Sequence, residues 1–378
     1  MNIQFTQTRL SSLVTGENSL DFLYSLKNFP VFIGCTESPA EQDKRADMNW
    51  DICTKTGFIQ LKDLLPLDVI YSAYHSEAVG GVWAEHHESL AQFCAEFGLQ
   101  NVLEIGGSNA VIAEKYVRLE PEAHWTIVEP NPNFETKGNI KLIKGFFDEN
   151  FVFEGEPDGV IHSHVLEHLY EPFEALNDIF NLLKPGQKHI FSIPQLHKWL
   201  QNKFPNTLNF EHTVFLTEEL LDEALPAFGF KILEKKHFKE HSVFYATERL
   251  EQKAPYKVTN RYEEYKKLFL EFIEYHDEMV ADLNEKIDNF DGPVYLFGAH
   301  IFSQFLLEFG LKTDRIVSIL DDSELKQGKR LYGSNLFVEK PTVAKDKGAV
   351  LAIVKAGSYT EEISNRLREM NPKITIIN

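Results

Sequence analysis

Small residues and a carboxylate are spaced along residues 101–129 in a way that suits a nucleotide-like ligand. Gly106 and Gly107 directly follow the apolar run Val102-Leu-Glu-Ile105, and small residues at such a bend let backbone amides approach a ligand at the start of a helix. Glu129 ends the next run about twenty residues further on, where a carboxylate can accept hydrogen bonds from both hydroxyls of an adenosine ribose. The residues expected to bind the cofactor here are Glu104, Gly106, Gly107 and Glu129.

The carboxyl ends of the next two expected strands add groups of the same kind. Phe147 and Asp148 follow the run Ile140-Lys-Leu-Ile143, where an aromatic ring can stack on adenine and a carboxylate can accept from its amino group. His164 follows the run Gly159-Val-Ile-His162, and ligands of parallel sheets bind at such carboxyl ends. We therefore add Phe147, Asp148 and His164 to the expected cofactor site.

The segment around His164 also distinguishes between two possible kinds of cofactor. An enzyme that uses a nicotinamide dinucleotide would share the Gly106 turn and Glu129, but not this fourth-strand segment or the Lys184-Pro-Gly186 turn. The pattern favours methyl transfer from S-adenosylmethionine. Because Glu167 and His168 are adjacent and His164 precedes a helix, no convergent ligand set is indicated, and we expect no metal site.

Alternating strands and helices must position these residues. The runs described above, with Lys188-His-Ile-Phe-Ser-Ile193 and a helix near 172–183, predict a parallel α/β sheet. Residues 230–235 and 242–247 are too close for a crossover helix, so they predict a hairpin that adds a closing antiparallel strand, as in methyltransferase sheets. A helix over 86–97 should precede the sheet, with His86 and His87 half exposed.

The rest of the chain predicts two flanking units. Residues up to about 73 are punctuated by Gly, Pro and Asp, which indicates a small, loop-rich α+β lobe. Residues 261–289 show helical spacing without Gly or Pro, and strands at 294–299, 316–320 and 350–354 indicate a second Rossmann-like unit. The expected fold class is α/β, with an N-terminal α+β lobe (1–80), a central Rossmann-like methyltransferase sheet (81–250), and a helical linker with a Rossmann-like C-terminal domain (251–378).

Composition restricts the partners. The formal net charge of -19 over 378 residues opposes the electrostatic attraction that supplies most nucleic-acid affinity. No apolar stretch approaches about 18 residues and the start lacks a basic region before an apolar run, so we expect a cytoplasmic protein without a membrane segment.

Cys35, Cys53 and Cys94 show no paired spacing, so neither a disulfide framework nor a zinc site is indicated. A monomer and a homodimer both stay open.

The chain resembles the bacterial sugar C-methyltransferase family over nearly all of its length. The segments that carry this resemblance are Cys53-Thr-Lys-Thr-Gly-Phe-Ile-Gln-Leu61, Leu103-Glu-Ile-Gly-Gly107, His164-Val-Leu-Glu-His168, Phe210-Glu-His212, and Phe297-Gly-Ala299 with Leu320-Asp-Asp-Ser-Glu-Leu-Lys-Gln-Gly-Lys329. The resemblance implies an N-terminal zinc lobe, a central methyltransferase domain and a C-terminal Rossmann-like domain. It also implies a nucleotide-linked sugar substrate, of the kind used for surface polysaccharides or specialised sugars, between the central and terminal domains. The Gly298 and Ala299 amides would be available to its diphosphate.

The same resemblance implies catalytic residues. His212 is expected beside the sugar as the general base, with Glu211 orienting it or binding a hydroxyl. Tyr74, in Ile70-Tyr-Ser-Ala-Tyr-His75, is expected where the first lobe reaches over the site, and there it would bind or protonate the sugar.

Two positions depart from the family's pattern. The family's zinc lobe has four cysteines in paired spacing, whereas this chain keeps Cys53 and at most Cys35, so we expect the lobe to hold its shape without metal. The family's Tyr-x-Glu-His segment reads Asn209-Phe-Glu-His212, and Asn cannot act as an acid or base. This loss favours O-methylation by a single base, with C-methylation still open. The alternatives are a non-catalytic cofactor-binding scaffold of the same fold, or a nicotinamide-dependent sugar oxidoreductase.

Overall fold

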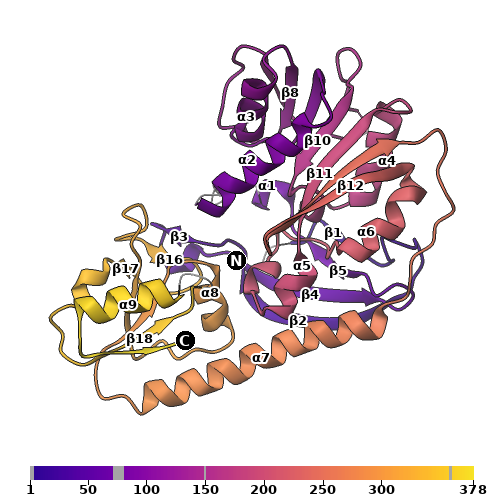
Figure 1. Ribbon diagram of the computed structural model, residues 1–378. Helices are drawn as coiled ribbons and strands as arrows, with labels where there is room; N and C mark the ends of the chain where they lie inside the picture. Colours follow the sequence, from indigo (N-terminus) through magenta and orange to yellow (C-terminus); the bar gives the residue numbers. More distant parts are fainter. Residues whose placement is uncertain (1–3, 71–80, 149, 357–359) are drawn as a thin grey trace.

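The structure, a computed structural model, describes residues 4–70, 81–148, 150–356 and 360–378 (Figure 1). Its largest sheet is built from β7 (Asn101–Ile105), β8 (His124–Glu129), β9 (Ile140–Lys144), β10 (Gly159–Ser163), β11 (Lys188–Pro194), β12 (Phe230–Phe238) and β13 (Ser242–Arg249). The strands lie in the order β12-β13-β11-β10-β7-β8-β9, and β13 runs antiparallel to both of its neighbours. This topology confirms the predicted Rossmann-like sheet and its closing hairpin.

Helices cover both faces of this sheet, so its central strands β7 and β10 are largely buried. On one face α2 (Gly81–Ala95) and α3 (Val111–Leu119) pack on Val102, Trp125 and Ile161. On the other face α4 (Pro172–Leu182) and α6 (Glu218–Ala224) pack on Leu103 and Val160. Because β7 lies between β8 and β10, the strand order reverses at β7, and a crevice opens at the carboxyl ends of these strands. Shorter helices follow the sheet's later strands, namely η2 (Leu166–His168), α5 (Leu196–Gln201), η3 (Pro205–Thr207) and η4 (Leu225–Phe228).

The N-terminal residues form more strand than the sequence indicated. β2 (Leu20–Pro30), β4 (Arg45–Cys53) and β5 (Ile59–Leu61) make an antiparallel sheet, and β1 (Gln7–Thr8) pairs with β6 (Asp63–Leu64). The helices η1 (Ala40–Gln42) and α1 (Leu67–Ile70) are short. Cys53 is buried and Cys35 is partly buried, and both thiols are free, as is that of Cys94.

The C-terminal residues form a second parallel sheet, as predicted. Its strands are β14 (Val294–Phe297), β15 (Ile316–Leu320), β17 (Val338–Glu339), β18 (Val350–Val354) and β19 (Ile374–Ile377), in the order β17-β15-β14-β18-β19. The accompanying helices are α8 (Ile301–Glu308), η5 (Pro341–Ala344) and α9 (Thr360–Met370).

The long helix α7 (Tyr262–Asp288) joins these parts and runs beneath them in Figure 1. Its first half places Phe269 and Phe272 in one apolar cluster with Trp50 of β4. Its second half places Leu283 and Ile287 in the core of the C-terminal sheet. The apolar residues of α7 recur at helical spacing, so one apolar face of the helix packs against both the N-terminal and the C-terminal sheet. Within the described residues, none of the helices is both long and apolar enough to cross a membrane.

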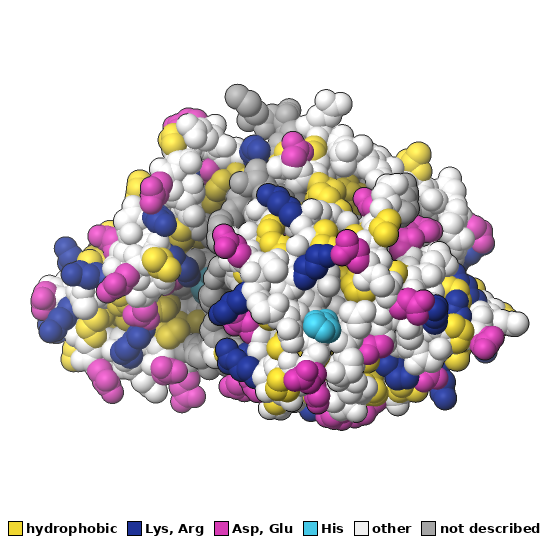
Figure 2. Space-filling view, turned by 90° about the horizontal axis from the view of Figure 1, so that it is seen from above, with side chains coloured by type: hydrophobic (Ala, Val, Ile, Leu, Met, Phe, Trp, Pro, Cys, Tyr) yellow, Lys and Arg dark blue, Asp and Glu magenta, His cyan; other side chains and the backbone are white. Residues whose placement is uncertain are grey.

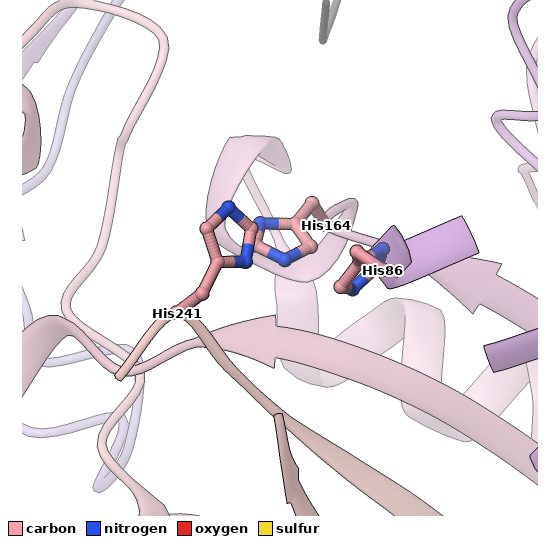
Figure 3. A group of neighbouring side chains, drawn as sticks. All are labelled: His86, His164 and His241. Carbon is pink, nitrogen blue, oxygen red and sulfur yellow. The ribbon is translucent and has the colours of Figure 1, made fainter. Parts of the chain in front are cut away.

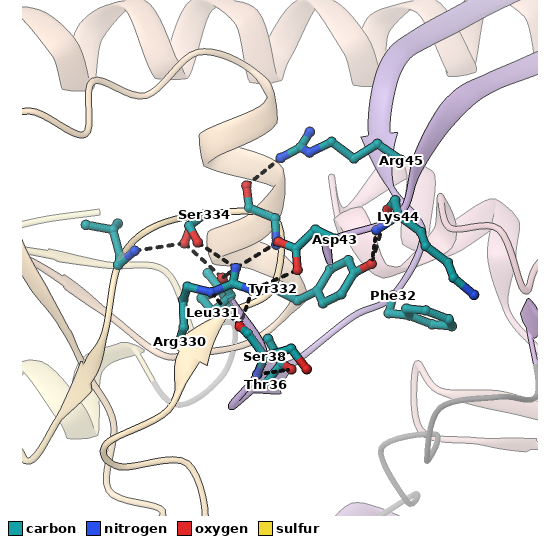
Figure 4. A network of polar contacts seen from close by, with 12 residues as sticks. Phe32, Thr36, Ser38, Asp43, Lys44, Arg45, Arg330, Leu331, Tyr332 and Ser334 are labelled. Atoms are coloured by element: carbon teal, nitrogen blue, oxygen red, sulfur yellow. Dashed lines mark hydrogen bonds and ion pairs between the residues drawn. The ribbon is translucent and has the colours of Figure 1, made fainter. Parts of the chain in front are cut away.

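A buried ion pair links the first lobe to the C-terminal part of the chain (Figure 4). β3 (Cys35–Thr36) pairs with β16 (Arg330–Leu331), and Arg330 donates two parallel hydrogen bonds of 2.7 Å to the Asp43 carboxylate. Both side chains are only 5% exposed. Arg330 also donates to the Ser38 carbonyl, and Asp43 accepts from the Gly333 amide. These contacts hold the first lobe and the C-terminal part of the chain together.

Replacing this arginine is expected to destabilise the protein. In Arg330→Met the Asp43 carboxylate would stay buried without its partner, which lowers the free energy of unfolding by about 3 kcal/mol. Urea denaturation followed by circular dichroism measures this change. The matched control is Lys27→Met, which breaks the exposed Lys27–Asp47 pair and should change stability little. Equal effects of the two substitutions would contradict the expectation.

Candidate functional site

A cavity of about 870 Å³ lies at the carboxyl ends of β7, β8 and β10. One end is lined by Gly106, Glu129 and Phe147, and the other end by His168, Glu211 and His212. Phe32 and Ile33 of the first lobe and Ile301 of α8 also reach its wall. The crevice that the strand order predicts is therefore a cleft to which all three parts of the chain contribute.

The turn after β7 requires glycine at two positions. Gly106 has a φ of +72°, and a Cβ there would lie 2.8 Å from the Val165 side chain. A Cβ on Gly107 would lie 2.5 Å from Ile127 of β8. Only residues without side chains let this turn pack so closely. The close approach leaves the backbone of Gly106, Gly107 and Ser108 facing the cavity.

Glu129 organises both loops around this end of the cavity. Its carboxylate accepts from the Ser108 amide at 3.1 Å and from the Asn131 amide at 2.9 Å, one bond to each oxygen. Each carboxylate oxygen has a further acceptor position. Glu129 therefore fixes the loop geometry and keeps capacity for two hydroxyl donors, as a ribose would supply.

Three other residues expected at the cofactor site differ in their exposure. Glu104 is buried and accepts from the Trp125 indole at 2.7 Å. Burial raises the pKa of Glu104 to about 7, and the indole bond only partly offsets this. Phe147 is half-buried in the cavity wall beside the more exposed Phe146, whereas Asp148 is exposed and accepts from the Asn150 amide.

His164 adopts an unusual backbone conformation at the end of β10. Its φ is +53°, in the left-handed region that side chains rarely adopt, and its amide donates to the Ser192 carbonyl. The ring lines the cavity, with Nδ1 3.3 Å from the Glu167 carboxylate and Nε2 2.8 Å from the Ser242 hydroxyl. His164 is thus clamped between two polar partners.

His212 is held from both its backbone and its ring. The Asn209 side-chain oxygen accepts from the amides of Glu211 and His212, at 2.8 and 2.9 Å. The Nδ1 atom of His212 lies 3.1 Å from the Thr207 carbonyl oxygen. A carbonyl only accepts, so Nδ1 carries the proton and Nε2 keeps its lone pair. Asn209, which cannot replace a tyrosine chemically, instead fixes the backbone that carries the expected base.

A buried carboxylate, Glu167, faces the rings around it. One ring nitrogen from each of His168 and His212 lies within 4.8 Å of a Glu167 oxygen. Burial alone would raise the pKa of Glu167, but the three imidazoles around it outweigh that effect and lower this pKa to about 2. Burial, helped by His168, lowers the pKa of His212 to about 4. At neutral pH the site therefore combines a carboxylate with a neutral imidazole.

The structure also places residues that sequence reasoning missed or judged differently. Glu167 and His168 do converge with His212, which their adjacency in the sequence did not suggest. His86 is completely buried and not half exposed, because the β12–β13 hairpin covers it. The Gly298 and Ala299 amides are not free for a diphosphate, since they donate to the Leu320 carbonyl and the Asp321 carboxylate. Tyr74 lies outside the described residues.

A methyltransferase family model matches the central part of the chain, and several solved structures resemble this part. Residues 77–235 match a family model described as a methyltransferase domain. None of the curated proteins matches the chain. Solved structures that resemble it include human N-acetylserotonin methyltransferase in complex with SAM (17% identity, 45% of this chain and 53% of that one, TM-score 0.39). Others are the N-methyltransferase NodS from Bradyrhizobium japonicum (16%, 45% and 97%, 0.35) and an O-methyltransferase family protein from Burkholderia thailandensis (11%, 44% and 56%, 0.36).

The family match confirms the prediction of a methyltransferase domain in this part of the chain and supports S-adenosylmethionine as its cofactor. The chain spans about half the length of two of these solved structures, 53% and 56%.

Proposed function

We propose that the chain is an S-adenosylmethionine-dependent methyltransferase that methylates the sugar of a nucleotide-linked sugar, with His212 as the general base. The observation that carries this proposal is the single cavity that runs from Gly106 and Glu129 to His212. A cofactor and an acceptor bound at its two ends would meet within one continuous cavity, which is what direct group transfer requires.

The residues at the first end fit the cofactor. Glu129 has acceptor capacity for both ribose hydroxyls, and the Gly106–Gly107 turn lets backbone approach the ligand. Phe146 and Phe147 offer aromatic surface for adenine, whereas the exposed Asp148 does not line the cavity. Glu104 would act indirectly, by holding the turn in place, because its carboxylate already accepts a hydrogen bond from the Trp125 indole. When bound, the cofactor supplies a methyl group activated by a sulfonium.

The residues at the second end fit the proton transfer that such chemistry needs. The free Nε2 lone pair of His212 would accept the proton of a sugar hydroxyl, or of a carbon next to a keto group. Glu167 would stabilise the imidazolium that results, because a buried carboxylate lies beside the ring. Glu211 lines the same end of the cavity and would bind a sugar hydroxyl. No tyrosine is needed for the hydroxyl route, so we favour O-methylation.

A second cavity suits the anionic part of such a substrate. It has a volume of about 340 Å³ and lies between the segment after α5, helix α7 and helix α8. Lys203 and Lys355 line it, and burial, helped by these two ammonium groups, lowers the pKa of His276 to about 4. Two ammonium groups near one cavity would attract a diphosphate. On the face seen in Figure 2, by contrast, acidic and basic side chains are interspersed, which gives nucleic acid no basic surface there.

Two measurements on the full chain test the proposal. S-adenosylmethionine at about 100 times its Kd is expected to stabilise the folded state by about 2.7 kcal/mol, seen as a higher Tm. Incubation with S-adenosylmethionine and a panel of nucleotide sugars, followed by NMR, should then locate one added methyl group. A thermal shift without methyl transfer to any sugar would favour the scaffold alternative, and oxidation of reduced nicotinamide during turnover would favour the oxidoreductase.

A further inference from the structure

Three histidines from distant parts of the chain form a compact group beside the cavity (Figure 3). His86 comes from α2, His164 from the end of β10, and His241 from the turn between β12 and β13. One ring nitrogen of each lies within 4.8 Å of the others. The ring centroids are 5.3 to 5.4 Å apart in all three pairs, so the rings surround a common centre.

His86 is the member of this group whose polar atoms lack partners in the described part of the chain. Its side chain is completely buried, and both ring nitrogens have no hydrogen-bond partner among the described residues. Trp83, Phe238 and Phe244 contact the ring and provide no acceptor. An unsatisfied buried polar group costs about 1–3 kcal/mol, so an imidazole kept in this position calls for a ligand.

His164 is oriented as metal-binding histidines usually are. Its Nδ1 lies against the Glu167 carboxylate, so Nδ1 carries the proton and Nε2 keeps the lone pair that a metal ion would take. The Ser242 hydroxyl lies 2.8 Å from this Nε2 and 2.5 Å from Nδ1 of His241. One hydroxyl has one proton and cannot donate to both rings. The group is therefore rich in lone pairs and poor in donors.

We propose that His86, His164 and His241 bind one divalent transition-metal ion, with zinc as the expected occupant. Imidazole nitrogen is a preferred ligand of zinc, and three histidines leave a fourth position for water. Tetrahedral zinc needs ligand nitrogens roughly 3.3 Å apart. The three nitrogens now lie within 4.8 Å of one another, so the rings would turn toward the ion on binding. The ion would join α2 and the β12–β13 hairpin to the strand end that lines the cavity. This role does not depend on the methyl-transfer proposal.

The test uses the full chain, stripped of metal with a chelator and titrated with zinc chloride by calorimetry. We expect one zinc per chain, confirmed by elemental analysis, and a higher Tm for the zinc-loaded protein. His86→Gln and His241→Asn should each weaken zinc binding at least about tenfold. His241 is half-buried in a turn, so His241→Asn should fold normally. It therefore tests zinc binding even if His86→Gln fails to fold.

Two further variants show which histidines are responsible. His124→Gln removes an exposed histidine at the start of β8 and should leave zinc binding unchanged. His212→Gln removes a member of the neighbouring Glu167, His168 and His212 group and should also leave it unchanged. Less than one zinc per chain in the native protein, undiminished binding in His241→Asn, or loss of zinc only in His212→Gln would each overturn the proposal.

Discussion

His212→Ala is expected to lower kcat about a thousand-fold while the affinity for S-adenosylmethionine stays unchanged, because a positioned general base contributes about 10²–10⁴-fold. The ring lies at the end of the cavity away from Gly106 and Glu129, so its loss should not disturb the cofactor end. Single-turnover kinetics measures the chemical step, and calorimetry measures cofactor binding. Added imidazole should restore part of the rate by entering the space that the ring vacates.

The pH profile gives an independent reading of the same residue. Burial disfavours the charged ring and lowers the pKa of His212 to about 4. A base must be unprotonated to accept a proton, so kcat/KM should hold its plateau from neutral pH down to about 5 and fall as the pH passes below about 4. A His212→Ala enzyme with ordinary kcat, or a profile that already falls near pH 6.5, would argue against His212 as the base.

The central sheet could be predicted from sequence because its signals are local. β7 and β10 are short, mostly apolar runs that small or polar residues follow, and burial on both faces produces such runs. The first lobe gave a weaker signal. β2 is eleven residues long, but register shifts between Phe22 and Tyr24 and between Leu26 and Phe29 break its alternation. A period-two pattern interrupted twice resembles a loop-rich segment.

The site was harder to predict than the sheet, because its residues meet across long separations. Local helical spacing cannot show that residues 238–244 cover His86. The role of Asn209 did have a local signal, since Asn two and three residues before a backbone amide commonly accepts from it. The resemblance aligns Asn209 with a catalytic tyrosine, which directs attention to acid and base chemistry and away from its role as a backbone acceptor.

Glu129→Ala is expected to weaken S-adenosylmethionine binding about a thousand-fold, because two hydrogen bonds to a charged acceptor contribute about 1.5–3 kcal/mol each. The substitution also frees the Ser108 and Asn131 amides, which now hold the two loops through the carboxylate. Calorimetry on the purified chain measures the loss. The control is Glu135→Ala, which removes an exposed carboxylate from the loop after β8 and should leave the affinity unchanged.

A 2′-deoxyribose analogue of S-adenosylhomocysteine separates the ribose contact from the loop effect. In the native protein, loss of the 2′-hydroxyl should weaken binding, since Glu129 loses a donor. In Glu129→Ala the same loss should have little further effect, because two changes to one contact are not additive. If the deoxy analogue weakens binding equally in both proteins, Glu129 holds the loops without touching the ribose, and the carboxylate would then act on the cofactor only through the Ser108 and Asn131 amides.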